Sequence, residues 1–322
     1  MPLILAADIG GTTSRFAVFS ATPDGALALL DDPLRLSTND FSSFRDLLLA
    51  VRDSVLGQAF ARADRVAFAV AGPVRGGLCD PPNIAWDLDL DRDLDGLGLG
   101  LGLGLRPAVL VNDFVAQAWG CLTEAGSGAE VIQAGQADPA RPLAVVGAGT
   151  GLGHCALVPD GSGGHAALPS EAGHAAFAFE GQEEAEFVRF VRANTGVAAP
   201  VGDQVVSGSG LALVHWFLTS ERLTPEEAAA HLDGDSPTLR WFARFYGRAC
   251  RHYVLNVLGL GGLYVSGGVA ARNPVLVRHR AFLREFTDSE AFGGLLAKVP
   301  VRLNANQDTG LYGAAFCAAR VS

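Results

Sequence analysis

The sequence lacks an excess of positive charge. Its 322 residues carry 24 Lys and Arg against 34 Asp and Glu, which gives a formal net charge of −10 at pH 7. Nucleic-acid binding depends on a basic face that displaces counterions from phosphates, so this balance argues against a nucleic-acid partner. An acidic chain can still bind a nucleotide where backbone N–H groups and a metal ion supply a local positive potential.

Long hydrophobic runs and a basic N-terminal region are also missing. The first apolar run stops at Asp8, too early for a signal peptide, and no uninterrupted apolar run reaches about 18 residues. We therefore expect a cytoplasmic protein with no transmembrane helix and no membrane partner. With 49% apolar and 18% charged residues, the chain can form a large core and is long enough for two domains.

Paired cysteines are absent as well. The five cysteines are far apart in the sequence and form no C-x-x-C pair; they are Cys79, Cys121, Cys155, Cys250 and Cys317. This spacing argues against a zinc site or a disulfide framework, and it indicates scattered buried thiols in a reducing compartment.

A glycine turn between two apolar runs is the first motif that suggests chemistry. It is the segment Asp8–Arg15, with the sequence DIGGTTSR, and its pattern is typical of strand, tight turn and strand. Glycine N–H groups that no Cβ shields form an anion-binding concavity, and the carboxylate of Asp8 could hold a hydrated Mg²⁺. The segment predicts a site for a phosphate and its metal, although an ordinary hairpin turn explains the same pattern.

A second glycine segment repeats this design in the middle of the chain. An apolar run leads into Gly147–Gly153, with the sequence GAGTGLG, and a strand pattern resumes after it. Gly149-Thr150 then corresponds to Gly11-Thr12, which indicates duplicated halves with one phosphate-binding hairpin each. Val146 stands where the first copy has Asp8, so only the first copy offers a carboxylate for a metal.

Alternating strand and helix signals indicate an α/β protein. The predicted strands lie at 26–36, 66–71, 107–111 and 263–265, besides those that flank the two glycine turns. The predicted helices lie at 41–56, 114–122, 183–193, 210–218, 225–232, 237–258 and 309–319, and the last could pack back on the first domain. The Leu-Gly alternation at 96–105 predicts a low-complexity loop without chemistry. We expect a small domain of 1–123 with 303–322 and a large domain of 124–302.

Asn112-Asp113 follows the predicted strand 107–111 directly. Ligands of α/β folds converge at the carboxyl ends of strands, and phosphoryl transfer to a hydroxyl needs one positioned group to accept the proton. Asp113 meets both conditions and is the candidate general base. The alternative is that these two residues only cap the helix that follows, as residues of these types often do.

The motifs of the whole chain resemble those of the bacterial glucokinase family, which are ATP-dependent hexose kinases. The resemblance extends along nearly the whole chain and depends on the order and number of the motifs. They are Asp8–Arg15, Ala69–Val74, Asn112-Asp113-Phe114, Gly147–Gly153, Glu171–His174, Ser207–Leu211, Ser266–Val269 and Asp308–Leu311. The resemblance implies a duplicated actin-like (ribonuclease-H-like) ATPase fold, with two α/β domains around a central cleft, and a homodimer.

The same resemblance implies phosphorylation of glucose at its 6-hydroxyl by ATP and Mg²⁺. The ATP-binding residues that it implies are Asp8, Gly10, Gly11, Thr12, Thr13, Gly149, Thr150, Gly267 and Gly268. Asp8 would also hold Mg²⁺ through water, and the last two glycines would pass under the adenosine. The sugar-binding residues that it implies are Asn112, Asp113, Glu171, His174 and Asp203, with Asp113 as the base. His174 could instead be an ordinary loop histidine, and Arg15 either a structural residue or an outer phosphate contact.

Asp203 departs from the family pattern. The family usually has a sugar-binding glutamate a few residues before the segment Ser207-Gly208, and this chain has a carboxylate one methylene shorter. Asp203 could reach the sugar through a small backbone shift or a water, or it could change the preferred sugar. A kinase of the same fold for fructose, mannose or an amino sugar therefore stays open.

Two further classes of function stay open beside the kinase. A sugar-sensing repressor would need a DNA-binding extension, and none fits in the seven residues before Asp8. A phosphohydrolase of the same superfamily would release phosphate without a sugar. The cysteine-rich zinc motif of a related sugar-kinase and repressor family is missing after Glu171–His174, which favours the branch without that zinc.

Overall fold

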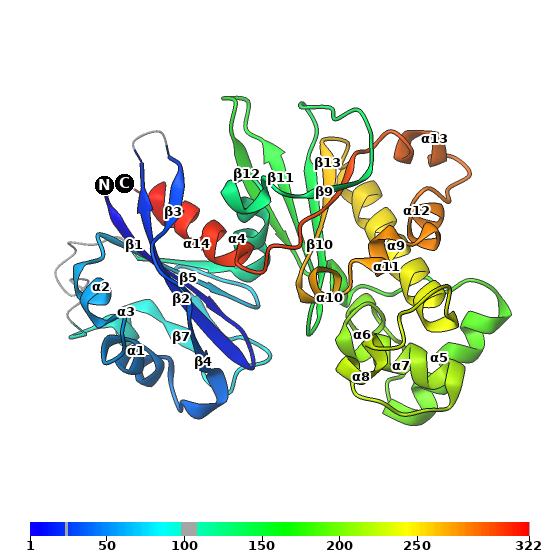
Figure 1. The fold of residues 1–322 in the computed structure, drawn as a ribbon, viewed down its shortest axis with the longest axis horizontal. Coiled ribbons are helices and arrows are strands. Elements are labelled where there is room, and N and C mark those ends of the chain that lie inside the picture. The colour runs from blue at the N-terminus through cyan, green and yellow to red at the C-terminus, as the bar shows by residue number, and fades with distance from the viewer. Residues whose placement is uncertain (23–24, 98–107, 322) are drawn as a thin grey trace. The chain divides into compact units, whose positions relative to one another are not determined.

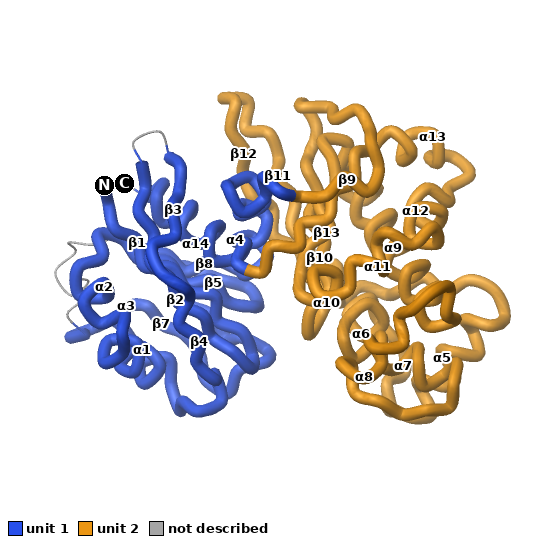
Figure 2. The backbone as a smooth tube through the Cα atoms, viewed as in Figure 1, with its two compact units in different colours: residues 1–128, 308–322 blue, residues 129–307 orange. Residues whose placement is uncertain are grey.

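The computed structural model describes residues 1–22, 25–97 and 108–321, so the Leu-Gly repeat at 96–105 lies mostly outside the described residues. The chain divides into two compact units, coloured separately in Figure 2. Unit 1 is Met1–Gly128 with Asp308–Ser322, and unit 2 is Ala129–Gln307. The domain bounds expected from the sequence stay a prediction. Within the described ranges, no helix is both long enough and apolar enough to cross a bilayer.

Unit 1 is built on one sheet with the strand order β3-β2-β1-β5-β8, and β4 also pairs with β2. The strands are β1 (Leu3–Ile9), β2 (Thr13–Ala21), β3 (Leu27–Leu29), β4 (Leu34–Ser37), β5 (Arg65–Val70) and β8 (Ala108–Asn112). The strands β6 (Leu78–Cys79) and β7 (Leu88–Asp89) pair separately. The helices are α1 (Phe44–Arg52), α2 (Gly57–Arg62), α3 (Leu90–Leu94), α4 (Asp113–Gly120) and α14 (Thr309–Ala319), with short 3₁₀ turns at Thr38–Asp40 and Glu124–Gly126.

The apolar stretch at 26–36, expected as one strand, forms the two short strands β3 and β4. They pair with different parts of β2, since Leu29 lies opposite Phe19 and Leu34 lies opposite Phe16. The break falls at Asp31–Pro33, where two exposed aspartates precede a proline that has no N–H for the ladder. The prediction of a single strand was therefore wrong.

Two separate cores cover the faces of the unit 1 sheet. One contains Phe44 of α1 and Phe68 of β5, and the other is rich in alanine and includes Leu311 and Ala315 of α14. Figure 1 shows α14, at the red end of the chain, beside α4. The last helix has the predicted bounds and packs on the first unit, as the sequence indicated. Because α14 packs on unit 1, its first residues lie beside the first glycine turn.

Unit 2 is built on a sheet with the order β12-β11-β10-β13-β14-β9. The strands are β9 (Glu130–Gln133), β10 (Leu143–Ala148), β11 (Leu152–Pro159), β12 (His165–Ser170), β13 (Gly262–Ser266) and β14 (Val301–Leu303). The helices are α5 (Gly181–Thr195), α6 (Gly202–Val205), α7 (Gly208–Thr219), α8 (Pro225–Ala229), α9 (Pro237–Val257), α10 (Gly268–Arg272), α11 (Val275–Arg278), α12 (Arg280–Phe286) and α13 (Gly293–Leu296), with a 3₁₀ turn at Ala172–His174.

The two sheets repeat one topology. In unit 1 the hairpin β1-β2 is antiparallel, and β5 and then β8 add in parallel beside β1. In unit 2 the hairpin β10-β11 is antiparallel, and β13 and then β14 add in parallel beside β10. In each sheet a further antiparallel strand, β3 or β12, pairs with the second strand of the hairpin. The duplication predicted from the two glycine segments is therefore confirmed.

Candidate active site

Three neighbouring parallel strands of unit 1 end at one edge of its sheet. Ile9 of β1, Val70 of β5 and Asn112 of β8 lie in register. The chain segments that follow these strands leave the same edge, which is where α/β folds collect ligand-binding groups. The structure thus places Asp8, the metal candidate, and Asp113, the base candidate, at one edge of this sheet.

The first glycine turn is fixed by a buried threonine. The backbone N–H of Gly10 donates to the Thr13 carbonyl at 3.1 Å, and that of Thr38 donates to the Thr12 carbonyl at 3.0 Å. The Thr38 hydroxyl donates to the Gly10 carbonyl at 2.7 Å, and Thr38 is 1% exposed. Sequence reasoning missed Thr38, because only the folded chain brings it beside the turn. Thr12 and Thr13 are exposed, so their hydroxyls can meet a ligand.

The second glycine of the turn, Gly11, is explained by the close approach of the backbone at Asn83. Neither Gly10 nor Gly11 has a left-handed φ, so this turn does not depend on a backbone conformation that only glycine adopts easily. A Cβ on Gly11 would lie 2.8 Å from the carbonyl oxygen of Asn83, which is shorter than a normal contact. The absence of a side chain therefore lets the segment around Asn83 pack against the turn.

Arg15 lies between two carboxylates at this turn. It stands opposite Asp8 in the β1-β2 register and forms an ion pair with it. Its Nη1 also contacts Oδ1 of Asp308, just before α14, at 3.3 Å. This geometry supports the structural role considered for Arg15. The side chain of Asp8 is 22% exposed, and carboxylate oxygens are the ligands that Mg²⁺ prefers while it keeps several waters, so these residues fit a hydrated Mg²⁺.

Asn112 caps α4, as the alternative interpretation of the sequence proposed. Its Oδ1 accepts hydrogen bonds from the backbone N–H groups of Phe114 and Val115, and its Nδ2 donates to the Gly72 carbonyl at 3.1 Å. Asp113 is the first residue of the helix and half-buried, and its Oδ1 accepts from the Phe114 N–H at 2.9 Å. The positive end of the helix dipole favours a negative charge at this position. A carboxylate held this way is oriented by the backbone.

The second glycine turn is held by Asp203 of α6. The Gly149 N–H donates to the Gly151 carbonyl at 2.7 Å, and the Leu152 N–H donates to Oδ1 of Asp203 at 2.6 Å. A Cβ on Gly151 would lie 2.2 Å from the same Oδ1, so a side chain at this position would have to displace the carboxylate. Thr150, at the tip of the turn, is exposed. Asp203 therefore anchors this turn, a role that the sequence did not indicate.

The sugar candidates of unit 2 gather around Leu152. Glu171 precedes a 3₁₀ turn and His174 is its last residue, with side chains 58% and 61% exposed, and Oε2 of Glu171 lies 3.9 Å from Nε2 of His174. Gly173 of that turn packs on the Leu152 carbonyl, and Asp203 binds the Leu152 N–H. The structure thus brings together all three residues that the resemblance implied for unit 2.

The adenosine candidates Gly267 and Gly268 lie beside the second turn. Ser266 of β13 pairs in register with Gly147 of β10, so Gly267 comes next to Ala148. The hydroxyl of Tyr246 joins the two strands, because it accepts from the Ala148 N–H at 3.0 Å and donates to the Ser266 carbonyl at 3.2 Å. Burial raises the pKa of Tyr246, so its hydroxyl stays a donor. Sequence reasoning had given Tyr246 no role beyond its place in the predicted helix 237–258.

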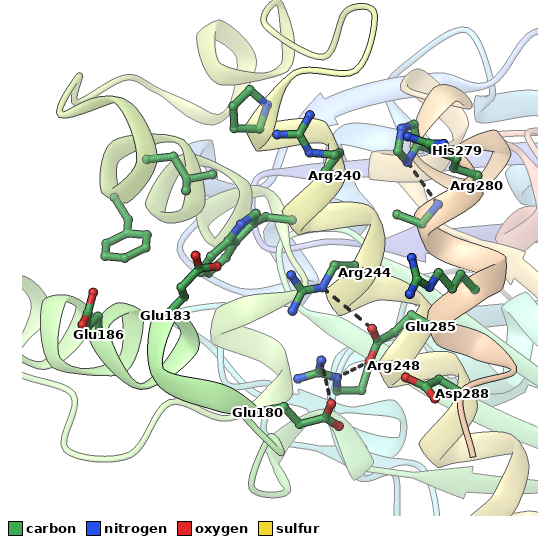
Figure 3. A pocket seen from close by; sticks show the side chains of 16 residues that line it. Glu180, Glu183, Glu186, Arg240, Arg244, Arg248, His279, Arg280, Glu285 and Asp288 are labelled. Carbon is green, nitrogen blue, oxygen red and sulfur yellow. Dashed lines mark hydrogen bonds and ion pairs between the residues drawn. The ribbon is translucent and has the colours of Figure 1, made fainter. Parts of the chain in front are cut away.

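A cavity of about 1030 Å³ lies between α5, α9 and α12 of unit 2, and it is lined by none of these candidates (Figure 3). A buried ion cluster forms one wall. Arg248, 0% exposed, donates to Glu184 and to Glu285 at 2.6 Å each. Because each buried charge has a partner of opposite sign, we interpret the cluster as a structural link between the three helices.

A family model for glucokinase matches residues 5–321. The chain belongs to the glucokinase family. It is 31% identical to a glucokinase of Synechocystis over 98% of both chains. The crystal structure of a glucokinase from an Antarctic psychrotroph matches all of both chains with a TM-score of 0.80 and 26% identity. That of a Streptomyces griseus ROK family glucokinase in complex with glucose and AMPPNP matches 99% of this chain and all of the other, with a TM-score of 0.63 and 20% identity.

These similarities confirm the predicted fold and family. This glucokinase-family chain has the duplicated actin-like ATPase fold, and the repeated strand order of its two sheets is that duplication. The roles of the individual site residues stay predictions, which the geometry above makes specific enough to test.

Proposed function

We propose that this chain transfers the γ-phosphoryl group of ATP to the 6-hydroxyl of glucose, giving glucose 6-phosphate and ADP. The observation that carries the proposal is the placement of Asp8 and Asp113 at the carboxyl edge of one parallel strand set in a glucokinase-family fold. A phosphate-binding turn and a proton acceptor at one sheet edge are what phosphoryl transfer to an alcohol requires.

Asp113 is the proposed base. The 6-hydroxyl donates a hydrogen bond to its carboxylate, which accepts the proton as the oxygen attacks the γ-phosphorus and the bond to the ADP oxygen breaks. The helix α4 holds Asp113 at its first residue, and the Phe114 N–H fixes one of its oxygens. A positioned base of this kind contributes about 10²–10⁴-fold to the rate.

The glycine turns are the proposed phosphate-binding elements. In unit 1, the N–H groups around Gly10-Gly11 and the exposed hydroxyls of Thr12 and Thr13 would donate to phosphate oxygens. In unit 2, Gly149 and Thr150 would do the same, and Gly267-Gly268 would lie under the adenosine. Asp8 would hold a hydrated Mg²⁺, which neutralises charge on the phosphates when bound.

The sugar-binding residues of this proposal are Asn112, Asp113, Glu171, His174 and Asp203. Glu171 and His174 have exposed side chains that can bind hydroxyls of the sugar. Asp203 commits Oδ1 to the Leu152 N–H, so its second oxygen would receive the sugar hydroxyl. Because this side chain serves two partners, it is the residue most able to change which hexose is preferred.

The test is a coupled assay of ADP formation with ATP and a panel of glucose, fructose, mannose and glucosamine. We expect glucose to give the highest kcat/KM. A higher value for another sugar would reassign the substrate to that hexose. Phosphate release that is independent of any sugar would replace the kinase with a phosphohydrolase.

A homodimer is part of the same proposal. Light scattering coupled to size-exclusion chromatography would give twice the chain mass of 33.4 kDa if it forms. A mass equal to one chain would reject the dimer and leave the proposed reaction untouched.

A further inference from the structure

Three metal-ligating side chains meet in the helical part of unit 2, and none of them belongs to the proposed active site. His215 lies in α7, Glu221 follows that helix, and His231 follows α8. One ligand atom from each lies within 4.8 Å of the other two. Two imidazoles and a carboxylate are donors that divalent transition metals such as Zn²⁺ accept, whereas Mg²⁺ prefers oxygen ligands alone.

His215 gives an independent sign that a ligand binds here. The residue is 2% exposed, and its Nε2 has no hydrogen-bond partner among the described residues. Buried polar atoms are almost always paired, because an unpaired one loses its hydration without compensation. Oε2 of Glu221 lies 3.7 Å from Nε2, beyond hydrogen-bond reach. A metal ion bound to Nε2 would satisfy the buried nitrogen.

The other ring nitrogen of His215 is already held. Nδ1 lies 3.0 Å from the hydroxyl oxygen of Thr238, a 2% exposed residue in the first turn of α9. When Nδ1 carries the proton and donates to this hydroxyl, Nε2 is left as a bare acceptor. Metal-binding histidines are usually oriented by such a second hydrogen bond, which fixes both the tautomer and the direction of the ring.

The distances fit a site that closes on its metal. The rings of His215 and His231 have centroids 4.8 Å apart and are tilted by 34°. Tetrahedral Zn²⁺ with bonds of about 2.0–2.1 Å sets its ligand atoms roughly 3.4 Å apart. His215 is fixed by burial, whereas Glu221 and His231 are exposed and can rotate inward to that spacing.

We propose that His215, Glu221 and His231 bind one Zn²⁺ or a similar divalent transition metal, with water in the fourth position. The ion joins α7 to the segment after α8 and closes the chain between 215 and 231, so its role is structural. The wide spacing of the cysteines argues only against a thiolate site. This set of imidazole and carboxylate ligands is also different from the cysteine-rich motif that is missing after Glu171–His174.

The first test measures binding directly in untagged, full-length protein that a chelator has stripped of metal. Calorimetric titration with Zn²⁺ is expected to give one ion per chain, and Mg²⁺ no signal at this site. Glu221→Gln and His231→Gln, both at exposed positions, should weaken Zn²⁺ binding at least about 10-fold. His165→Gln, which removes an imidazole from β12, should bind as wild type does. Binding that is unchanged in both ligand variants would overturn the proposal.

The second test identifies the ligands and the consequence for stability. Co²⁺ in place of Zn²⁺ should give visible absorption without the charge-transfer bands of thiolate ligands; such bands would assign the ion to a cysteine and overturn the proposal. At 100 times its Kd, Zn²⁺ should raise the melting temperature by about 4–8 °C in wild type and in His165→Gln. The same shift in His231→Gln, or no shift in wild type, would contradict the structural role.

Discussion

Asp203 accepts a hydrogen bond from the backbone N–H of Leu152 at 2.6 Å, and this bond joins α6 to the second glycine turn. Gly151 makes room for the carboxylate, because any Cβ there would lie 2.2 Å from its Oδ1. Asp203 is one methylene shorter than the glutamate usual in the family. This shorter side chain places one carboxylate oxygen against the backbone of the turn. The residue links the proposed phosphate-binding turn to the proposed sugar residues.

Replacing Asp203 should separate these two roles. Asp203→Ala leaves the Leu152 N–H unpaired, so we expect the free energy of unfolding to fall by about 1–3 kcal/mol and the KM for ATP to rise. Asp203→Asn keeps the acceptor oxygen and should restore most of the stability, but it should raise the KM for glucose if the charge binds the sugar. Asp233→Ala, an exposed aspartate of the same unit, is the control. Equal stability of wild type and Asp203→Ala in urea titrations would show that the anchor does not matter.

Asp113→Asn tests the base. Because the amide keeps the shape and the Oδ1 contact with the Phe114 N–H, the fold should persist while kcat falls about 10²–10⁴-fold. The KM for glucose should change much less, since only proton acceptance is lost. The exposed Asp31→Asn is the matched control. Turnover near the wild-type value in Asp113→Asn would assign the base to another residue.

Asp8→Asn tests the metal ligand. The change removes the negative charge that would hold hydrated Mg²⁺ and also releases Arg15 from its ion pair. We expect the Mg²⁺ concentration for half-maximal activity to rise at least about 10-fold. Asp308→Asn keeps the Asp8–Arg15 ion pair and should raise this Mg²⁺ concentration much less. If the two variants have the same Mg²⁺ dependence, Asp8 has no special part in metal binding.

Arg248→Met tests the buried ion cluster. It removes the cation between Glu184 and Glu285 and leaves two buried carboxylates without their partner, so the free energy of unfolding should fall by about 3–5 kcal/mol. Chemical denaturation followed by circular dichroism measures this loss. Arg52→Met breaks an exposed ion pair with Asp53 and should leave stability unchanged. A loss no larger than that of the control would mean that the cluster is not a stabilising link.

Acid should destabilise the protein through His154. Burial lowers the pKa of this 3% exposed imidazole from 6.5 to about 4 in the folded chain. The unfolded chain takes up a proton as the pH falls below 6.5 while the folded chain does not, so stability present above pH 6.5 is lost toward pH 4. The loss from this group is about 3 kcal/mol.

The test compares how steeply the free energy of unfolding falls with pH in wild type and in a variant without His154. His154→Phe keeps the apolar contact with Tyr253 and removes the titrating group, so its stability should fall less steeply between pH 6.5 and 4. The burial and cationic neighbours of His252 lower its pKa too, so a residual slope is expected. His165→Phe should keep the wild-type slope. Parallel slopes for wild type and His154→Phe would remove His154 as the cause.

The sequence by itself determined the principal strands and helices around the motifs, and their order. Strong local signals predicted the glycine turns, the long helix α9 and the last helix with its observed bounds. The single strand predicted at 26–36 was wrong, because the pairing of β3 and β4 with separate parts of β2 depends on a partner strand. The sequence also did not predict the strands β9, β12 and β14 or the helices α2, α6 and α10–α13. The two turns and the strands around them were enough to predict the duplication, since it repeats a local pattern.

Only the tertiary structure decided which residues meet. Thr38, Tyr246 and Asp308 lie far along the chain from the turns that they hold, and no spacing in the sequence connects them. The same is true of His215 and His231, which only the fold of α7 and α8 brings together. Local patterns follow from backbone geometry within a few residues, whereas hydrogen bonds and ion pairs between distant segments exist only after the core has packed.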